Sequence, residues 1–574
     1  MSIQQKKGMV ATMSSQSLEQ PASETMSGGE AIVRSLQANG IDTVFGIPGA
    51  QIYPLFDALQ RLGMRTIYPR HEQTAAYMAM GAANSTGRPA CFAVVPGPGI
   101  LNTTAALCTA MGTCSPVLGL TGQVPSGFLG KGRGHLHELR DQPGILRALV
   151  KEAMFIQDPL ETSGTINEAF STMQSGRPGP VTVEMCWDTM AAPTAATIRP
   201  GIALGAIIGP PINSDLVSRV VNQLLAAKRP MIMCGKGAQH ASTDVQRLAE
   251  LLGAPVAAFR SGRGVVAEDH PLGVSSLAAR LLFDSTDLVL GLGSRLEMMS
   301  MRWATPGQNE PRDLNGPILI RVDIDGDELG RYTPDFGVVG DVGVFCRAAI
   351  ALLETRADPD PMRADEIATA KATAERMAGK IQPQVDFLRV IRDVLPRDGF
   401  LVPELSQMGF TSYFAFPVLA PRTYVTEGFQ GTLGYGFPTA LGVKVANPNR
   451  AVVSITGDGG FLFGLQELAT AAAHNVATVT VVFNNNAYGN VRRDQLNGFQ
   501  GRLAGADLVN PDFVKLADSF GVLAHRVATP VQLRSVLAAA LDSNRPVLIE
   551  VTTPTGSETN PWEYIHMKQT PKEG

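Results

Sequence analysis

Two apolar stretches, each ending in a polar turn, constrain the fold of this chain most strongly. Residues 451–456 (AVVSIT) stop at Gly457-Asp458-Gly459-Gly460, and residues 477–483 (ATVTVVF) stop at a run of three asparagines that begins at Asn484. Between them, residues 465–474 are alanine-rich and helical in pattern. Strand, helix and strand in this order predict a parallel βαβ unit, so both polar turns are expected at one edge of a sheet.

The chemistry of these two turns indicates a metal and a diphosphate. Backbone amides of a glycine-rich turn are free to meet phosphate oxygens, and ligands of open α/β sheets bind outside the carboxyl ends of the strands. Magnesium prefers oxygen ligands in an octahedral array. We therefore expect Asp458, Asn485 and a nearby backbone carbonyl to hold such an ion together with a diphosphate.

The same stretch resembles the thiamine-diphosphate signature, GDG followed at a fixed interval by NN, of the acetolactate synthase and pyruvate decarboxylase superfamily. The resemblance implies thiamine diphosphate and Mg²⁺ as cofactors, with Asp458, Asn485 and Ala487 as the metal ligands. It implies further cofactor contacts at Gly457, Gly459, Gly460, Tyr488 and Gly489.

An upstream region supplies a second part of the expected site. Residues 41–53 and 66–74 have a strand, turn and helix pattern, and Glu72 begins the second helix. In the family that it resembles, a glutamate here hydrogen-bonds the pyrimidine ring of the cofactor and promotes removal of the thiazolium proton. That role needs a carboxyl group shielded from water, with a raised pKa. The alternative is an ordinary acidic residue at the start of a helix.

Further segments match the family pattern. Residues 96–102 (PGPGILN) resemble its SGPGxxN loop, and residues 121–125 (TGQVP) match a strand end of the same sequence. Residues 431–438 (GTLGYGFP) resemble GTMGxGLP, where a bulky apolar residue, here Leu433, wedges beneath the cofactor and bends it. A core leucine is the alternative. The remaining cofactor contacts implied by the resemblance are Gly49, Pro96, Gly97, Asn102, Gln123, Gln407 and Gly431.

Length and composition agree with a large α/β enzyme. A chain of 574 residues exceeds one ordinary core, so we expect three doubly wound parallel-sheet domains: pyrimidine-binding, Rossmann-like central and diphosphate-binding. The net charge of −4 and the lack of a basic stripe argue against nucleic acid as a partner. No stretch has the length of a membrane span, and six scattered cysteines fit reduced thiols, which favours a cytoplasmic location.

Composition shifts predict the domain boundaries. The expected divisions are a disordered tail (1–26), the pyrimidine-binding domain (27–190), a linker (191–213), the central domain (214–355), a helical connector (356–380), the diphosphate-binding domain (381–553) and a C-terminal tail (554–574).

The substrate pocket departs from that of acetolactate synthases. Where those enzymes have AFQE, this chain has residues 135–138 (HLHE), so that His137 replaces their Gln. Lys151 matches their lysine, and both residues are candidate catalytic residues. His137 could bind a carboxylate or relay protons, or could lie in a solvated loop. Asn490 and Asp494 replace the Met and Trp that line the family's substrate channel, which predicts a more polar pocket.

The sequence of the central domain does not decide which nucleotide, if any, it binds. Residues 270–277 (HPLGVSSL) lack the family's flavin-binding GMHG turn, whereas Gly293-Ser294-Arg295 is similar to a GxR strand end that binds an adenine nucleotide in acyl-CoA lyases. FAD, ADP or neither fits the sequence.

The chain as a whole resembles the acetolactate synthase large subunit more than other members of the superfamily. The resemblance implies a carbon–carbon lyase or ligase, dependent on thiamine diphosphate and magnesium, that decarboxylates a 2-keto acid and protonates the product or joins it to a second carbonyl compound. Two alternatives remain: an acyl-CoA lyase or decarboxylase of the oxalyl-CoA decarboxylase or 2-hydroxyacyl-CoA lyase type, and a non-catalytic nucleotide-binding homologue. The resemblance implies a homodimer or homotetramer with active sites between subunits; it also allows a regulatory subunit, which no sequence feature indicates.

Overall fold

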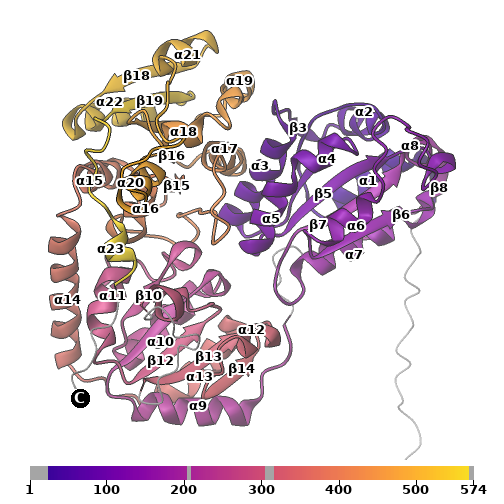
Figure 1. Cartoon of the computed structure of the whole chain (residues 1–574). Helices are drawn as coiled ribbons and strands as arrows, with labels where there is room; N and C mark the ends of the chain where they lie inside the picture. The colour runs from indigo at the N-terminus through magenta and orange to yellow at the C-terminus, as the bar shows by residue number, and fades with distance from the viewer. Residues whose placement is uncertain (1–22, 203–208, 304–315, 568–574) are drawn as a thin grey trace, which may run out of the picture.

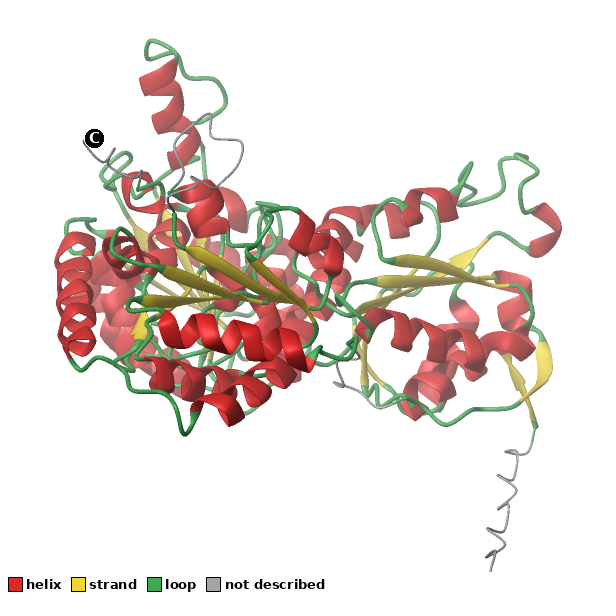
Figure 2. Ribbon diagram, turned by 90° about the horizontal axis from the view of Figure 1, so that it is seen from below, coloured by secondary structure: helices red, strands yellow, loops and turns green. Residues whose placement is uncertain are grey.

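The computed structural model describes residues 23–202, 209–303 and 316–567, which form three α/β units in chain order (Figure 1). Each unit is built on a parallel sheet with helices packed against it, as the view from below also shows (Figure 2). The expected fold class, three α/β domains with parallel sheets, is confirmed. Among the described residues, no helix combines the length and apolar character needed to cross a membrane.

The first domain has a six-stranded sheet of order β3-β2-β4-β5-β7-β6, in which all neighbouring pairs are parallel. Strands β4, β5 and β7 are buried along their whole length, as expected for central strands covered on both faces. Its strands are β2 (Thr43–Gly46), β3 (Arg65–Ile67), β4 (Ala90–Val94), β5 (Val117–Gln123), β6 (Glu152–Ile156) and β7 (Val181–Cys186). Its helices are α1 (Gly28–Ala38), α2 (Tyr53–Arg61), α3 (Glu72–Thr86), α4 (Pro98–Asn102), α5 (Thr104–Gly112), α6 (Gln142–Arg147), α7 (Thr162–Gln174) and α8 (Trp187–Ala191).

The central domain has a parallel sheet of order β11-β10-β9-β12-β13-β14. The strand order reverses between β9 and β12, which makes a crevice at their carboxyl ends. Its strands are β9 (Pro230–Cys234), β10 (Val256–Ala258), β11 (Gly273–Val274), β12 (Leu288–Leu292), β13 (Ile318–Asp323) and β14 (Phe336–Val339). Its helices are α9 (Ser214–Ala226), α10 (Ser242–Leu252), α11 (Ser276–Phe283), α12 (Gly326–Gly330) and α13 (Val342–Leu353), and α14 (Met362–Ala378) connects it to the third domain.

The third domain has a five-stranded parallel sheet of order β15-β16-β17-β19-β18. The predicted βαβ unit appears as β16, α19 and β17, with β16 and β17 paired in parallel. The strands are β15 (Phe400–Pro403), β16 (Val452–Gly457), β17 (Val479–Asn484), β18 (Leu523–Val527) and β19 (Val547–Thr552). The helices are α15 (Gln384–Val394), α16 (Gln407–Ala415), α17 (Gly436–Ala446), α18 (Asp458–Phe461), α19 (Leu468–Ala473), α20 (Gly489–Gly498), α21 (Phe513–Ser519), α22 (Pro530–Asp542) and α23 (Trp562–Ile565).

Helices α3 and α17 join the first and third domains within the chain (Figure 1). Both are buried over most of their surface and carry many small side chains, so neither has the narrow apolar stripe of a surface helix. Buried residues of the two helices belong to one hydrophobic cluster that extends into both sheets. The two domains therefore share a continuous core.

Two ends of the chain differ from the predicted boundaries. Residues 24–26, assigned to a tail, belong to strand β1 (Glu24–Ser27), which pairs antiparallel with β8 (Pro193–Ala196) inside the predicted linker. The pairing is made by backbone groups, which the side-chain pattern does not reveal. Residues 1–22 of the predicted tail lie outside the described residues. Beyond residue 553 the chain packs along the third domain and ends its described part in α23.

Candidate active site

A cavity of about 190 Å³ lies at the carboxyl ends of β15, β16 and β17 in the third domain. It is lined by ten of the predicted cofactor contacts: Gln407, Leu433, Gly457, Asp458, Gly459, Gly460, Asn485, Ala487, Tyr488 and Gly489. The two polar turns therefore meet as the βαβ pattern predicts. Gly431 is the one predicted cofactor contact in this domain that is not part of the lining; it lies exposed in the loop before Leu433, with a φ of 63°.

Asp458 and Asn485 face the cavity from adjacent strand ends and are both buried. The Asn510 amide donates to Asp458 Oδ2 at 2.7 Å, and the Ala487 backbone amide donates to Asn485 Oδ1 at 3.0 Å. Burial raises the pKa of Asp458, while the Asn510 hydrogen bond opposes that shift. Carboxylate, amide and carbonyl oxygens converging on one buried space are a donor set that suits Mg²⁺.

Glycine is required on the wall of this cavity. A Cβ on Gly459 would stand 2.3 Å from the Tyr488 ring, and one on Gly489 would stand 2.9 Å from Asn485 Nδ2. Larger residues would therefore push Tyr488 and Asn485 out of place. Because Gly457, Gly459 and Gly460 have no side chains, a ligand in the cavity can approach their backbone groups closely.

Glu404, which no sequence motif indicates, fixes the loop that carries Leu433. Glu404 is buried at the end of β15 and accepts hydrogen bonds from the backbone amides of Gly434 at 2.9 Å and Gly436 at 2.6 Å. Burial raises the pKa of Glu404 to about 8. The side chain of Leu433, half-buried, forms part of the cavity lining. A buried carboxyl group thus holds the backbone immediately after Leu433.

The first-domain candidates gather at the carboxyl ends of β2, β4 and β5. The Asn102 amide donates to Glu72 Oε2 at 3.0 Å, and a Cβ on Gly99 would lie 3.8 Å from Glu72 Cγ. Gly49 and Gly99 both lie against Val95, since a Cβ on either would stand 2.5 Å from that side chain. Gln123, at the end of β5, is buried and accepts from the Val124 amide. Glu72 itself is partly exposed in the single chain.

His137 lies over the Pro96-Gly97 turn. A Cβ on Gly97 would be 2.6 Å from the His137 carbonyl oxygen, and His137 Nδ1 is 2.9 Å from Gln51 Oε1. Burial lowers the pKa of His137. The structure therefore brings His137 into the first-domain cluster. Its hydrogen-bond partner Gln51 is not indicated by any sequence motif.

Two buried residues, Gln142 and Glu184, support the same turn. The Gln142 side chain accepts from the Gly97 amide at 2.9 Å and donates to Glu184 Oε2 at 2.5 Å. Burial raises the pKa of Glu184, on β7, to about 7. Gly97, Gln142 and Glu184 are distant in sequence, which explains why no motif reveals this support.

Lys151 does not join either cluster. Its ammonium group donates to the carbonyl oxygens of Thr172, Ser175 and Arg177 at 2.6, 2.6 and 2.9 Å. All three donors of the lysine are thus used at the carboxyl end of α7. The lysine therefore binds the carbonyl groups at the end of a helix, whereas the family resemblance implied a catalytic role.

The residues after Ala487 make one wall of the third-domain cavity polar. Asn490 lines the cavity and accepts from Trp562 Nε1 at 2.5 Å. Arg493 also donates to Asn490 Oδ1, and Asp494 accepts from Asn490 Nδ2 at 3.2 Å. Asp494 is absent from the cavity lining, and its side chain is 61% exposed. The expected polarity is therefore present through Asn490, without Asp494 facing the cavity.

The two clusters do not share a cavity in the single chain. None of the described first-domain candidates lines the third-domain cavity. The domains meet elsewhere: the Arg70 amide donates to Glu467 Oε2 at 3.0 Å, and Thr109 and Thr432 are joined through their hydroxyl groups at 2.9 Å. Each cluster is thus half of an expected site.

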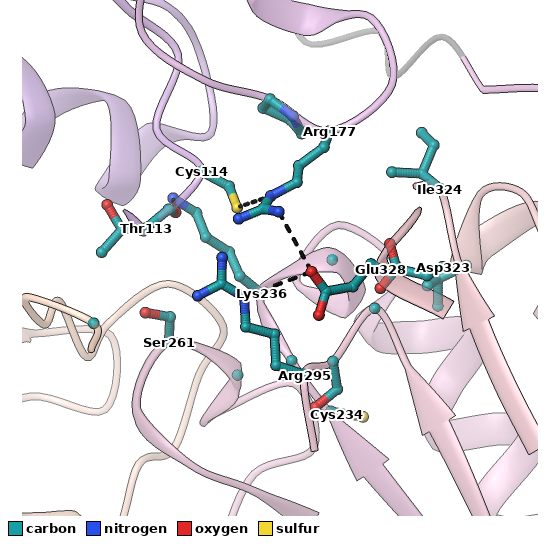
Figure 3. Close-up of a pocket in the computed structure, with 18 of the residues that line it drawn as sticks. Thr113, Cys114, Arg177, Cys234, Lys236, Ser261, Arg295, Asp323, Ile324 and Glu328 are labelled. Atoms are coloured by element: carbon teal, nitrogen blue, oxygen red, sulfur yellow. Dashed lines mark hydrogen bonds and ion pairs between the residues drawn. The ribbon is translucent and has the colours of Figure 1, made fainter. Parts of the chain in front are cut away.

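A larger cavity of about 230 Å³ lies between the central domain and the first domain (Figure 3). It opens at the β9/β12 crevice, where a Cβ on Gly235 would stand 2.1 Å from the Gly293 carbonyl oxygen. Arg295 from the turn after β12 and Asp323 at the end of β13 line it, together with Arg177 and Cys114 from the first domain. Burial raises the pKa of Asp323 to about 6.

Lys236 crosses between the two domains beside this cavity. Its ammonium group donates to Asn84 Oδ1 and the Thr113 carbonyl at 2.5 Å each, and to Ser115 Oγ at 3.2 Å. Burial lowers its pKa to about 7. Arg177 Nη1 lies 3.4 Å from Glu328 Oε2, and the Arg295 guanidinium stacks on Phe429 at 4.4 Å. Phe429 is only four residues before Leu433, so this cavity borders the loop of the other site.

Comparisons with known proteins agree with this geometry. The chain matches the family descriptions "Thiamine pyrophosphate enzyme, N-terminal TPP binding domain" over residues 26–145, "central domain" over 217–349 and "C-terminal TPP binding domain" over 405–551. It is 32% identical to a probable 2-ketoarginine decarboxylase of Pseudomonas aeruginosa, with 92% of this chain and 94% of that protein covered.

Other relatives are acetolactate synthases. The chain is 31% identical to a probable acetolactate synthase large subunit of Methanocaldococcus jannaschii, covering 92% of both chains. It is 29% identical to the acetolactate synthase large subunit of Haemophilus influenzae, covering 94% of this chain and 96% of that protein. The similarity therefore extends over nearly the full length of each protein.

Proposed function

Because the chain belongs to the thiamine-pyrophosphate-dependent enzymes, we propose that it is a magnesium-requiring carbon–carbon lyase or ligase that acts on a 2-keto acid. The observation that carries the proposal is the third-domain cavity, where Asp458, Asn485 and Ala487 meet beside Leu433. Hard oxygen donors and an apolar support in one space match what a metal-bound diphosphate and an attached ring require.

Each part of the cavity has a proposed task. Asp458, Asn485 and the Ala487 carbonyl hold Mg²⁺ and through it the diphosphate, while the glycines after β16 let the backbone approach the phosphates. Leu433 supports the cofactor in a bent conformation, and Glu404 secures this loop by accepting from the backbone amides of Gly434 and Gly436, which follow Leu433. When bound, thiamine diphosphate supplies the electron sink that decarboxylation of a 2-keto acid needs.

A second copy of the chain would complete the site. Glu72 is partly exposed in the single chain, and its cluster does not line the cavity of its own third domain. In a homodimer, or in a tetramer of such dimers, the Glu72 cluster of one copy would cover the Asp458 cavity of the other. That cover would also shield Glu72 from water, as proton exchange with the cofactor requires.

The polar wall favours a substrate larger and more polar than pyruvate. Asn490 and Glu558 both line the cavity, and Arg493 lies beside them. Among the relatives, one is a probable decarboxylase of a guanidinium-bearing keto acid and others are acetolactate synthases. We propose decarboxylation as the shared step, followed by protonation or by addition to a second carbonyl compound.

Product analysis tests the proposal directly. The purified protein, supplied with Mg²⁺ and thiamine diphosphate, is offered pyruvate, 2-ketoarginine and oxalyl-CoA in separate reactions. Carbon dioxide from a 2-keto acid is expected, with an aldehyde or an acyloin-type product showing which second step follows. Conversion of oxalyl-CoA alone, to formyl-CoA and carbon dioxide with the thioester intact, would favour the acyl-CoA lyase or decarboxylase alternative, and inertness toward every substrate would favour the non-catalytic homologue.

The central cavity is proposed to bind an ADP-containing nucleotide. Its position at a strand-order reversal, its close-packed glycine turns and an acid at the end of β13 are features of nucleotide sites in open α/β sheets. Arg177 and Arg295 would meet the phosphates, and Asp323 the ribose. ADP and FAD share this chemistry, so the test measures the thermal stabilisation given by each. Asp323→Asn should lose that stabilisation, and equal shifts in the variant and the wild type would contradict the assignment.

A further inference from the structure

The chain beyond β19 runs along Asn484 and Asn485, at the carboxyl end of β17. The Thr553 backbone amide donates to the Asn484 carbonyl at 2.9 Å, and the Thr555 hydroxyl donates to the Asn485 carbonyl at 2.6 Å. Residues 553–558 therefore hold the backbone of the turn that carries Asn485. We call them the clamp segment.

Glu558, the last residue of the clamp segment, reaches the side chain of Asn485. Both carboxylate oxygens lie 3.0 Å from Asn485 Nδ2, and Glu558 lines the same cavity as Asp458. The amide nitrogen is thereby taken by an acceptor, whereas the amide oxygen accepts from the Ala487 backbone on its other side at 3.0 Å.

These two contacts allow only one orientation of the Asn485 amide. If the group turned over, its oxygen would face the Glu558 carboxylate and its nitrogen would face the Ala487 N–H, so an acceptor would meet an acceptor and a donor a donor. The oxygen of Asn485 thus keeps its second lone pair available to the cavity. Metal sites generally depend on such partners of the ligand side chains.

Glu558 is itself held firmly. Its neighbour Thr559 accepts from the Gln384 side chain at 2.6 Å, and Thr559 donates through its backbone amide and its hydroxyl to the Gln382 carbonyl at 3.0 and 2.9 Å. These bonds tie the end of the clamp segment to the start of α15. The carboxylate therefore has a fixed anchor immediately next to it.

We propose that Glu558 is a positioning residue for metal binding, which fixes the Asn485 amide so that its oxygen faces the ion. The inference rests on the proposed function, because it assigns the ion to the Asp458 cavity. It adds a carboxylate from the extreme C-terminal part of the chain, outside both polar turns and outside the segment matched by the C-terminal domain description.

The test compares Glu558→Ala, Glu558→Gln and Glu563→Ala by the Mg²⁺ concentration that half-saturates thiamine diphosphate binding, followed by tryptophan fluorescence. Loss of the acceptor in Glu558→Ala should raise that concentration about 10- to 100-fold. Glu558→Gln still offers an oxygen to Asn485 Nδ2 and should retain most of the affinity. Glu563, exposed on α23, is the matched acidic control and should behave as wild type.

The outcomes separate the two proposals. Wild-type protein that binds no thiamine diphosphate at any Mg²⁺ concentration would overturn the proposed function. Wild-type protein that does bind, alongside a Glu558→Ala variant with the same Mg²⁺ requirement, would overturn the positioning role alone. Equal losses in Glu558→Ala and Glu558→Gln would also overturn it, because charge and not amide orientation would then decide metal affinity. Thermal melts of each metal-free variant show that the fold is intact.

Discussion

The backbone of Gly442 in α17 lies directly against the backbone of Met78 in α3. A Cβ on Gly442 would stand 2.0 Å from the Met78 carbonyl oxygen, and on the facing helix a Cβ on Gly81 would stand 2.3 Å from the Thr439 carbonyl. The first and third domains are therefore joined by two helices at backbone contact. This contact sets the separation of the Glu72 cluster from the Asp458 cavity within one chain.

Substitution of Gly442 by alanine should destabilise the joint between the domains. The added methyl group has no space, since its nearest neighbour is a backbone oxygen, and overpacking of this kind costs about 1–3 kcal/mol. The thermal midpoint of Gly442→Ala should fall below that of wild type. Gly330→Ala, in α12 with open space around its Cβ position, is the control. Equal midpoints for the two variants would show that the helices can move apart freely.

Truncation of Leu433 should slow catalysis while the cofactor is retained. If Leu433 supports the bent cofactor, Leu433→Ala leaves the diphosphate contacts intact but loses alignment, which can lower kcat about 100-fold. Leu433→Met keeps a long apolar side chain and should restore most of the rate. Thiamine content after gel filtration and kcat are measured for both. A fully active Leu433→Ala enzyme would show that Leu433 does not support the cofactor and is only a core leucine.

Mixing two inactive variants should restore activity if the site forms between copies. Glu72→Gln and Asp458→Ala each remove one half of the site, so each should be inactive alone. After the subunits exchange, half of the dimers are hybrids with one intact site each, which predicts recovery of about a quarter of the wild-type activity. Mixed variants that stay inactive, although exchange is shown by tagged subunits, would place both residues in the same chain's site.

The stability of the first domain should decline as pH rises toward neutrality because of Glu184. Its pKa is raised from 4.5 to about 7 by burial, so the folded state holds the proton more tightly than the unfolded state does. The stabilisation is complete below about pH 4.5 and is lost as pH rises through about 7, a change of about 3 kcal/mol at most.

Glu184→Gln is the matched variant for this prediction. The amide oxygen of the new side chain can still accept from Gln142 Nε2 but does not titrate. Thermal midpoints of both proteins are compared across this pH range. The wild type should lose stability relative to the variant as pH increases, and parallel curves would show that Glu184 titrates normally.

The candidate site was predictable where its residues form short contiguous motifs. The turns at Asp458 and Asn485 follow apolar strands of one βαβ unit, and parallel strands necessarily end at the same edge. The Pro96-Gly97 turn follows β4 in the same way. Strand ends and glycine turns are local properties, so their pattern is visible in the chain itself.

Partners that come from distant segments were not predictable. Glu404 under the Leu433 loop, Glu184 behind Gln142 and Glu558 beside Asn485 all act through contacts between residues far apart in sequence. Lys151 matches a family position in the sequence, and only the structure shows that its ammonium group donates to carbonyl oxygens at the end of α7.

The three parallel-sheet domains and the two polar turns of the third-domain cavity follow from the amino-acid sequence, because hydrophobic periodicity and glycine placement act over neighbouring residues. The carboxyl groups that support the loops of that cavity, and the position of the Glu72 cluster outside the cavity of its own chain, come from the packing of separate elements. The backbone contact of α3 with α17 is one such packing contact, and no local pattern encodes it.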